Sequence, residues 1–178
     1  MSIVLGCDLG AKFGWAIGDS DAGPNGKILE CDVCDLARYA KPTRSKPTTG
    51  LYMFARKLVV DHGVTVFCRE DSVKTLQQAV RNQRESKKNL QNALKHHAKY
   101  AAILELLIDL KKLDEIDPVD PRTLKKWAVN NGNAKKDQMT RAAKLLYGID
   151  TDDGNAADAA HVCAWAMLQH RRAGKPPF

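Results

Sequence analysis

The chain has 178 residues, of which 44% are hydrophobic and 28% are charged, and it carries a formal net charge of +7 with a pI near 9.2. These values are ordinary for one globular domain with a sizeable core. No apolar stretch approaches the length of a transmembrane helix and no signal-peptide pattern opens the chain, so we expect no membrane partner and a cytoplasmic location. The positive charge favours a polyanionic partner, and nucleic acid is the first candidate.

The first half of the chain predicts a meander of strands, a helix and a further strand. Apolar runs with a β-branched bias and the turns between them give the following order: strands near 2–8, 13–18 and 27–35, a loop over 40–49, a helix over 51–62 and a strand over 64–68. The helix is expected to stop at Gly63. The last of these strands delivers Glu70 at its end.

The second half of the chain is mostly helical. Its predicted elements are a helix over much of 74–112, a short strand at 115–116, a turn delimited by Pro118 and Pro121, and helices over 135–147 and 155–171. We expect a single α/β domain over residues 1–173 with a loose tail at 174–178. Its mixed sheet is flanked by helices, and parallel crossovers bring the first and fourth strands to one edge.

The cysteines do not predict a disulfide framework, because five is an odd number. Cys31 and Cys34 have the spacing of metal ligands, but no second such pair completes a tetrahedral site. They also fall in an expected strand, where residues three apart face opposite sides. We therefore expect reduced and mostly buried thiols.

Three carboxylates are candidates for a shared site. Asp8 ends the first strand, where an ionised carboxylate is costly to bury unless a cation or donor compensates it. Glu70 ends the strand expected beside it, and Asp158 lies near the start of the last helix, three residues after Asn155. Such oxygen ligands select Mg²⁺ or Mn²⁺, and two ions about 4 Å apart can activate a water and stabilise the leaving oxygen of a phosphodiester.

Structural explanations compete with this one. Asp8 could simply cap a hairpin turn. Asn155 could be the N-cap of the last helix, with Asp158 completing a capping box.

Four motifs, in the same order, resemble the RuvC family of Holliday-junction resolvases. They are Ile3–Gly10 with Gly14–Trp15, Glu70 after a strand, the Arg-x-x-Lys, Gly-x-Ala-x-Lys and Gln-Met pattern within 122–139, and Asn155–Ala159. The resemblance spans nearly the whole chain. It implies an RNase H-like five-stranded mixed sheet (three antiparallel strands, then parallel crossovers), a homodimer, and Mg²⁺-dependent paired nicks at four-way DNA junctions.

Carried over by position, the resemblance implies that Asp8, Glu70 and Asp158 are catalytic, metal-binding carboxylates. Our hypothesis is that Asp8 bridges two ions while Glu70 and Asp158 each hold one. Lys125 and Lys136 match basic positions near the scissile phosphate, where Lys136 would stabilise developing negative charge. Mn²⁺ is expected to substitute for Mg²⁺, and no organic cofactor is expected.

Asn155 departs from the family pattern, because many members have a fourth acidic residue there and some a histidine. A neutral amide is a poorer ligand, so the second ion is expected to bind weakly. Asp152, Asp153 or His161 could compensate. Asn155 stays among the candidate catalytic residues.

Basic residues in two stretches are candidates for DNA contact. They are Arg81, Arg84, Lys87 and Lys88 in the middle helix, and Arg122, Lys125, Lys126, Lys135 and Lys136 around Gly132. Phosphate contacts by such residues add salt-dependent affinity. The first group could equally be a solvated helix face.

We therefore predict a dimeric, Mg²⁺-dependent, structure-selective endodeoxyribonuclease that resolves four-way junctions. The alternatives are an RNase H-like nuclease acting on branched DNA or RNA, and a catalytically weakened junction-binding protein, which Asn155 motivates. The small size and basic middle helix lean towards a viral member of the family, which would act in the host cytoplasm.

Overall fold

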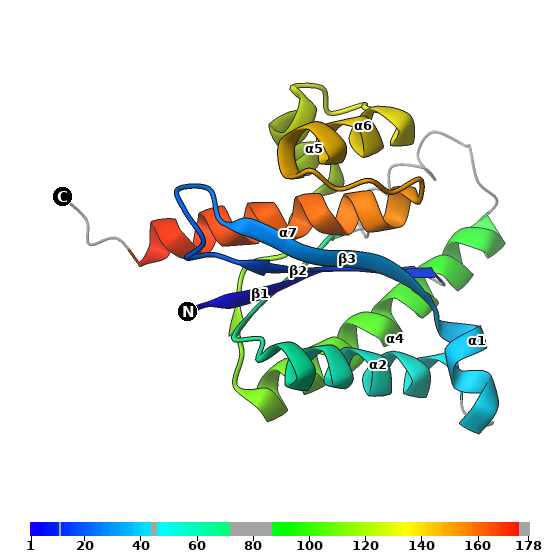
Figure 1. Cartoon of the computed structure of the whole chain (residues 1–178). Coiled ribbons are helices and arrows are strands. Elements are labelled where there is room, and N and C mark those ends of the chain that lie inside the picture. Colours follow the sequence, from blue (N-terminus) through cyan, green and yellow to red (C-terminus); the bar gives the residue numbers. More distant parts are fainter. Residues whose placement is uncertain (11, 44–45, 72–86, 175–178) are drawn as a thin grey trace.

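A mixed β-sheet with helices on both faces forms the centre of the molecule (Figure 1). The computed structural model describes residues 1–10, 12–43, 46–71 and 87–174; the tail residues 175–178 lie outside the described part. Within the described part, five strands follow the spatial order β3-β2-β1-β4-β5. They are β1 (Ile3–Asp8), β2 (Lys12–Asp19), β3 (Lys27–Asp35), β4 (Val66–Arg69) and β5 (Asp114–Glu115).

The strand directions are those of the predicted fold class. β1, β2 and β3 form an antiparallel meander, whereas β4 pairs parallel with β1 and β5 pairs parallel with β4. A parallel pair needs a long crossover, and the segments between these strands carry the helices that cover the sheet. The prediction of an RNase H-like mixed sheet flanked by helices is therefore confirmed.

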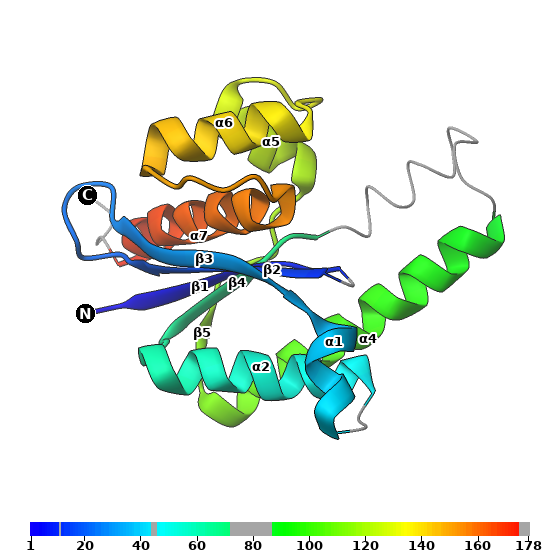
Figure 2. The ribbon, with the colours of Figure 1, turned by 45° about the vertical axis from the view of Figure 1, so that its right-hand side comes forward.

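The helices form layers on the two faces of the sheet (Figures 1 and 2). One face is covered by α7 (Gly154–Ala173), with α5 (Pro121–Val129) and α6 (Lys136–Tyr147) beyond it; the other is covered by α2 (Pro47–His62) and α4 (Lys87–Lys111). A short α1 (Leu36–Ala40) and the 3₁₀ turn η1 (Lys41–Thr43) follow β3. Among the described helices, none combines the length and the apolar character needed to span a bilayer.

Side-chain alternation along the strands separates two hydrophobic cores. Leu5 and Phe67 belong to the core under α2 and α4, whereas Val4 and Val66 belong to the core under α7. Residues paired across neighbouring strands project to the same face, so this alternation fixes which side chains reach α7.

Glycines let α7 approach the sheet very closely. A Cβ added at Gly6 would lie 2.4 Å from the backbone nitrogen of Cys163, and one added at Gly14 would lie 2.2 Å from the backbone oxygen of Asn155. No side chain fits between these backbones, which is a recognised reason for glycine inside a strand. The close approach places the first turn of α7 directly over the end of β1.

Two helix starts differ from the sequence-based expectation. The loop predicted over 40–49 is wrong at both ends, because η1 occupies its start and α2 already begins at Pro47. The turn predicted at Pro121 is instead the beginning of α5, where Asp120 accepts hydrogen bonds from the N–H groups of Arg122 and Thr123. In both helices proline takes the first helical position, where its missing N–H costs nothing and its φ is already helical.

The cysteines are free, as predicted. Cys7, Cys34, Cys68 and Cys163 are buried and Cys31 is partly buried. Burial raises the pKa of each thiol. Cys31 and Cys34 belong to different cores, so they do not form a metal pair.

Candidate active site

β1 and β4 deliver two carboxylates to one edge of the sheet. Cys7 pairs with Arg69 in the parallel ladder, and the N–H of Glu70 donates to the carbonyl oxygen of Cys7 at 2.9 Å. Asp8 and Glu70 are therefore neighbours across the two strand ends. Asp8 also pairs with Gly14, which faces α7, and alternation from the buried β4 residues places Glu70 on the same face.

Asp158 adds a third carboxylate from the N-terminal part of α7. The pKa of Asp8 is raised to about 7, first by burial and second by the negative charge of Asp158. Burial also raises the pKa of Asp158, whose Oδ1 atom is enclosed and has no hydrogen-bond partner. Two carboxylates in such surroundings resist joint ionisation unless positive charge compensates them.

Two lysines supply positive charge to this pair. Lys125 on α5 and Lys136 at the start of α6 both lower the pKa of Asp8 and of Asp158, so their ammonium groups lie within electrostatic reach of both carboxylates. Lys136 is fixed further, because its Nζ donates to Oδ1 of Asn155 at 2.8 Å. The five residues come from β1, α5, α6 and α7, and only the tertiary fold brings them together.

The carboxylates are chemically suited to a hard divalent cation, but their present arrangement is not a preformed coordination site. In the described ranges, no three His, Cys, Asp or Glu side chains are close enough to hold one ion. Asp8 and Asp158 are nevertheless an adjacent, poorly solvated pair, Asp158 has an orphaned oxygen, and Glu70 shares their sheet face. Oxygen ligands of this kind suit Mg²⁺ or Mn²⁺.

The competing explanation of Asn155 as the N-cap of the last helix, with Asp158 in a capping box, does not hold. The helix begins at Gly154, and Asp153 is its N-cap, with Oδ1 accepting the N–H of Asn155 at 2.8 Å. Asn155 and Asp158 are both inside the helix, so neither is required as a cap. Their side chains are free for another role, which for Asn155 is the contact with Lys136.

Two of the residues considered as substitutes for a fourth acid are not placed for that role. His161 is buried, and its Nε2 lies 3.0 Å from the carbonyl oxygen of Met139, so that nitrogen carries the proton and donates. Its Nδ1 then accepts from the Tyr147 hydroxyl at 3.1 Å. Asp152 is exposed, whereas the charge of Asp153 raises the pKa of Asp8 and so lies near the carboxylates.

The second basic group lies on the elements that flank the carboxylates. Arg122, Lys126 and Lys135 are exposed on α5 and just before α6. Of the first basic group, Arg81 and Arg84 lie outside the described residues. Lys87 and Lys88 begin α4, but their side chains also lie outside the described part.

Two glycines shape the site in ways that the sequence analysis did not predict. A Cβ at Gly154 would lie 2.8 Å from Cδ of Lys136, so a larger residue there would require the lysine side chain to shift from the helix start. Gly14 allows the close approach of Asn155. A glycine inside an apolar strand was the available signal for Gly14, since it indicates close backbone approach.

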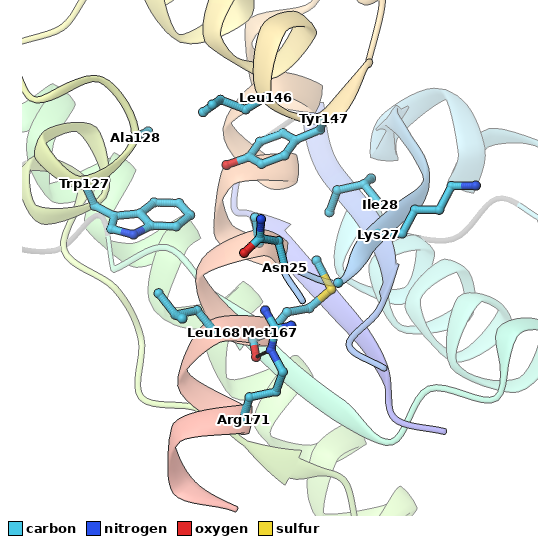
Figure 3. A pocket seen from close by; sticks show the side chains of 12 residues that line it. Asn25, Lys27, Ile28, Trp127, Ala128, Leu146, Tyr147, Met167, Leu168 and Arg171 are labelled. Carbon is cyan, nitrogen blue, oxygen red and sulfur yellow. Dashed lines mark hydrogen bonds between the residues drawn. The ribbon is translucent and has the colours of Figure 1, made fainter. Parts of the chain in front are cut away.

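A separate cavity of about 500 Å³ lies further along α7 (Figure 3). Trp127 and Tyr147 stand on its walls, and Met167 and Arg171 come from the C-terminal half of α7. At 1.5 Å per helical residue, Met167 is roughly 13 Å along the helix axis from Asp158. The cavity is thus distinct from the carboxylate pair.

Comparison with known proteins rests on structure alone. No protein-family model matches the chain, and no curated protein matches its sequence. Thermus thermophilus RuvC has a similar structure, with a TM-score of 0.67, 13% identity and 99% of each chain covered. The same protein in complex with a Holliday junction substrate gives 0.72, 12% and 100% of each chain.

A third similar structure is the yeast mitochondrial Holliday junction resolvase, with a TM-score of 0.54, 15% identity, and 97% of this chain and 84% of the other covered. At these identities the likeness concerns the path of the backbone. The five-stranded sheet of the described chain and the layers of helices agree with it over the full length. This chain therefore has the RuvC-like fold of Holliday-junction resolvases.

Proposed function

We propose that the protein is a divalent-metal-dependent endonuclease that resolves four-way DNA junctions by paired phosphodiester hydrolysis. The observation that carries this proposal is the pairing of Asp8 with Asp158 beside two lysines, on a sheet face shared by Glu70. Similarity of fold supports it, because T. thermophilus RuvC was solved in complex with a Holliday junction substrate.

Asp8, Glu70 and Asp158 are the residues that would hold the metal. The orphaned Oδ1 of Asp158 and the raised pKa of Asp8 both describe carboxylates whose burial the two lysines compensate only in part. When bound, Mg²⁺ or Mn²⁺ lowers the pKa of a water molecule and stabilises negative charge on the phosphodiester.

The lysines act on the phosphate itself. Lys136 lies at the exposed rim of the carboxylate pair, where its ammonium group can donate to a non-bridging phosphate oxygen as charge develops. Lys125, partly buried on α5, adds positive charge from the neighbouring helix. The water oxygen bonds to phosphorus as the bond to O3′ breaks and a proton passes to O3′, leaving a 5′-phosphate and a 3′-hydroxyl.

The DNA contacts are proposed for the exposed basic residues beside the site. Arg122, Lys126 and Lys135 flank the carboxylates, and the chain as a whole carries a net charge of +7. Exposed cations along one side of an active site position a phosphate backbone without reading its sequence.

Paired nicks require two active sites, so we propose a homodimer. Leu106 and Leu110 of α4 are 52% and 60% exposed and lie one turn apart on the helix. They form an apolar strip that a second copy of the chain could cover.

Two other functions remain as alternatives. One is an RNase H-like nuclease acting on other branched DNA or on RNA, which the shared fold also accommodates. The other is a weakened, junction-binding protein, which is favoured by Asn155 because its amide oxygen is occupied by Lys136.

The test is cleavage of a mobile four-way junction with Mg²⁺ and with Mn²⁺, analysed on a denaturing gel. We expect metal-dependent, symmetric cuts in the junction and much slower cleavage of a flap, a duplex and an RNA–DNA hybrid. Asp8→Asn should lower cleavage at least 100-fold while junction binding persists. Undiminished cleavage by Asp8→Asn would contradict the assignment, and preference for the hybrid would favour the RNase H-like alternative.

A further inference from the structure

A cavity of about 490 Å³ lies between the start of α2 and the middle of α4, on the face of the sheet opposite α7. Its polar lining comes from Lys46 and Thr48 on one side and from His96, Lys99 and Tyr100 on the other. Of the described residues that line it, none is acidic. The lining is therefore positive in sign, which favours an anion.

The first turn of α2 brings backbone donors to this cavity. The N–H groups in the first turn of an α-helix have no partner within the helix, and the positive end of the helix dipole lies there. Pro47 has no N–H, the N-cap Lys46 makes no side-chain cap, and the first turn holds no acidic residue. The N–H groups of Thr48 and Thr49 are thus left for an outside acceptor, for which an anion is well suited.

Tyr100 gives independent evidence of a ligand. Its side chain is 6% exposed, and it belongs to the core under α2 and α4 while also lining the cavity. Within the part of the chain that the structure describes, its hydroxyl has no hydrogen-bond partner, and its ring contacts that of His96 at 6.4 Å between centroids. Burial raises the pKa of Tyr100, so the hydroxyl keeps its proton and can donate. A buried phenol usually has a partner, and the cavity is where one can bind.

The lysines on the rim carry charge that the protein leaves uncompensated. Lys46 and Lys99 are exposed, and neither belongs to an ion pair among the described residues. His96 is exposed beside them and adds a ring N–H donor. Helix N-termini, lysine ammonium groups and tyrosine hydroxyls are donors that bind phosphate oxygens.

The cavity lies at the same end of the sheet as the carboxylates. α2 ends at His62 and the chain turns back through Gly63 into β4, so the start of α2 lies on the side of the molecule where β4 ends and Glu70 follows (Figure 2). Asp8 ends the neighbouring strand β1 on this side. A nucleic-acid backbone that reaches the carboxylates can therefore continue around this end of the sheet to the cavity.

We propose that this cavity binds a backbone phosphate of DNA outside the cleavage site, through the first turn of α2, Tyr100, Lys46 and Lys99. The inference rests on the proposed nuclease function, because that function supplies the DNA. The exposed rim suits a phosphodiester, which enters and leaves its site as part of a chain, and the volume leaves room for the flanking sugars. A free phosphate ion shares the same chemistry, and the experiment separates the two sources.

The experiment measures binding of a labelled four-way junction by fluorescence anisotropy, with a chelator present so that no cleavage occurs. Tyr100→Phe removes only the hydroxyl and is expected to weaken binding about 5- to 10-fold with an unchanged salt dependence, because no charge is lost. Tyr52→Phe, the same change at a residue of α2 that packs on the same core but does not line the cavity, is the matched control and should bind like wild type. Lys46→Gln with Lys99→Gln should lower the slope of log K against log salt by about 1, since one phosphate contact is lost.

Thermal unfolding without DNA tests whether the hydroxyl has a merely structural role. Because this hydroxyl has no hydrogen-bond partner among the described residues, Tyr100→Phe should melt at or above the wild-type temperature. A lower melting temperature, or junction binding equal to that of wild type, would overturn the proposal.

Isothermal titration calorimetry with inorganic phosphate separates the two sources of the anion. A phosphate ion that binds wild type but not Tyr100→Phe, while both chains bind the junction equally, would assign the cavity to free phosphate and overturn the DNA contact. Weaker junction binding by Tyr100→Phe supports the DNA contact.

Cleavage of the same junction with Mg²⁺ or Mn²⁺ keeps this proposal apart from the nuclease function. Junction binding that depends on Tyr100, without cleavage by wild type, contradicts the nuclease function alone. Cleavage by wild type together with unaltered binding by Tyr100→Phe contradicts the phosphate site alone. A wild-type chain that does not bind the junction contradicts both.

Discussion

The carboxyl groups of Asp8 and Asp158 are largely buried, and burial raises the pKa of both. They come from the first strand and the last helix, yet each is desolvated, and the negative charge of Asp158 adds to the burial of Asp8. Lys125 and Lys136 offset this cost only in part, because Asp8 still has a pKa of about 7. The metal-free carboxylate pair therefore costs folding stability, and a bound divalent cation, as proposed for this site, would relieve that cost.

The first prediction concerns Asp8→Asn in metal-free buffer with a chelator. Folded Asp8 keeps its proton up to about pH 7, whereas the unfolded residue loses it near its ordinary value of 3.8, so the folded state binds more protons between these values. Wild-type stability attributable to Asp8 must then fall as pH rises through this window. The variant changes no other residue, and asparagine at position 8 does not titrate, so this pH-dependent loss of stability is absent from Asp8→Asn.

We expect Asp8→Asn to gain about 2 to 4 kcal/mol of unfolding free energy relative to wild type between pH 5 and pH 8. Urea denaturation at several pH values measures the difference. The control is Asp109→Asn, an exposed residue of α4, which should follow the wild-type curve. Parallel curves for Asp8→Asn and wild type would contradict the burial and pairing of Asp8.

Sequence reasoning reached the carboxylates but not their environment. Strand ends and parallel topology are enough to expect Asp8 and Glu70 at one edge. The contact between Lys136 and Asn155, and the burial of His161 against Met139, depend on how α6 lies on α7. No local pattern reports that packing.

At the scale of elements, the packing of α7 on the sheet decides whether the site can form. Gly6, Gly14 and Gly18 of the sheet face the helix, and alanine recurs along its buried side. The backbone of α7 therefore packs almost directly on the backbone of the sheet, so neither can shift much to make room for a larger side chain.

The second prediction is that Gly6→Ala destabilises the protein by about 3 kcal/mol or more, because the new methyl group overlaps the backbone of Cys163. Thermal unfolding followed by circular dichroism measures the loss. Gly174→Ala, whose Cβ would meet nothing nearer than 3.7 Å, should be nearly neutral. Should Gly6→Ala fail to fold, Gly18→Ala provides a milder test, because the Cβ added at position 18 would lie 2.8 Å from the flexible Met167 side chain. An unchanged melting temperature in either variant would argue against close packing of α7 on the sheet.

The third prediction concerns the apolar strip of α4. Replacing Leu106 and Leu110 together by lysine should convert a dimer into a monomer, because like charges would face one another across the interface. Sedimentation equilibrium measures the mass. Leu145→Lys, on the exposed side of α6, is the control and should leave the dimer intact. A double variant that stays dimeric would place the interface elsewhere.

The elements themselves were predictable to different degrees. Apolar periodicity predicts the strands and the later helices. It does not predict α5, because Pro121 favours a turn there, or the first turn of α2, because Pro47 falls in the predicted loop. Proline both ends and begins helices, and only the cap decides between them. Asp120, directly before Pro121, was the available signal for α5.

At the scale of the whole molecule, the sheet separates two layers of helices. α5, α6 and α7 lie on the face to which Asp8 projects, whereas α2 and α4 cover the opposite face (Figure 2). Exposed basic residues occur on both sides, among them Lys126 near the carboxylates and Lys95 and Lys99 on α4. The DNA contact proposed beside the active site lies on α5 and α6 because these helices flank the carboxylates.

The fourth prediction is that replacing Lys126 and Lys135 together by glutamine weakens DNA binding and makes it less dependent on salt. The slope of log K against log salt should fall by about 2, since each lost phosphate contact removes roughly 0.9 on duplex DNA. Fluorescence anisotropy at several salt concentrations measures the slope. Lys111→Gln, at the end of α4, should leave it unchanged, and equal slopes for wild type and double variant would exclude this surface from DNA contact.

The distance along the chain between β1 and α7 has a consequence for synthesis on the ribosome. Asp8 is made well before Asp158 and before the helix that packs on Gly6 and Gly14. A nascent chain can thus pair β1 with β2 and β3 while the carboxylate pair is still incomplete. The proposed active site is completed only when α7 has been made and packs on the sheet.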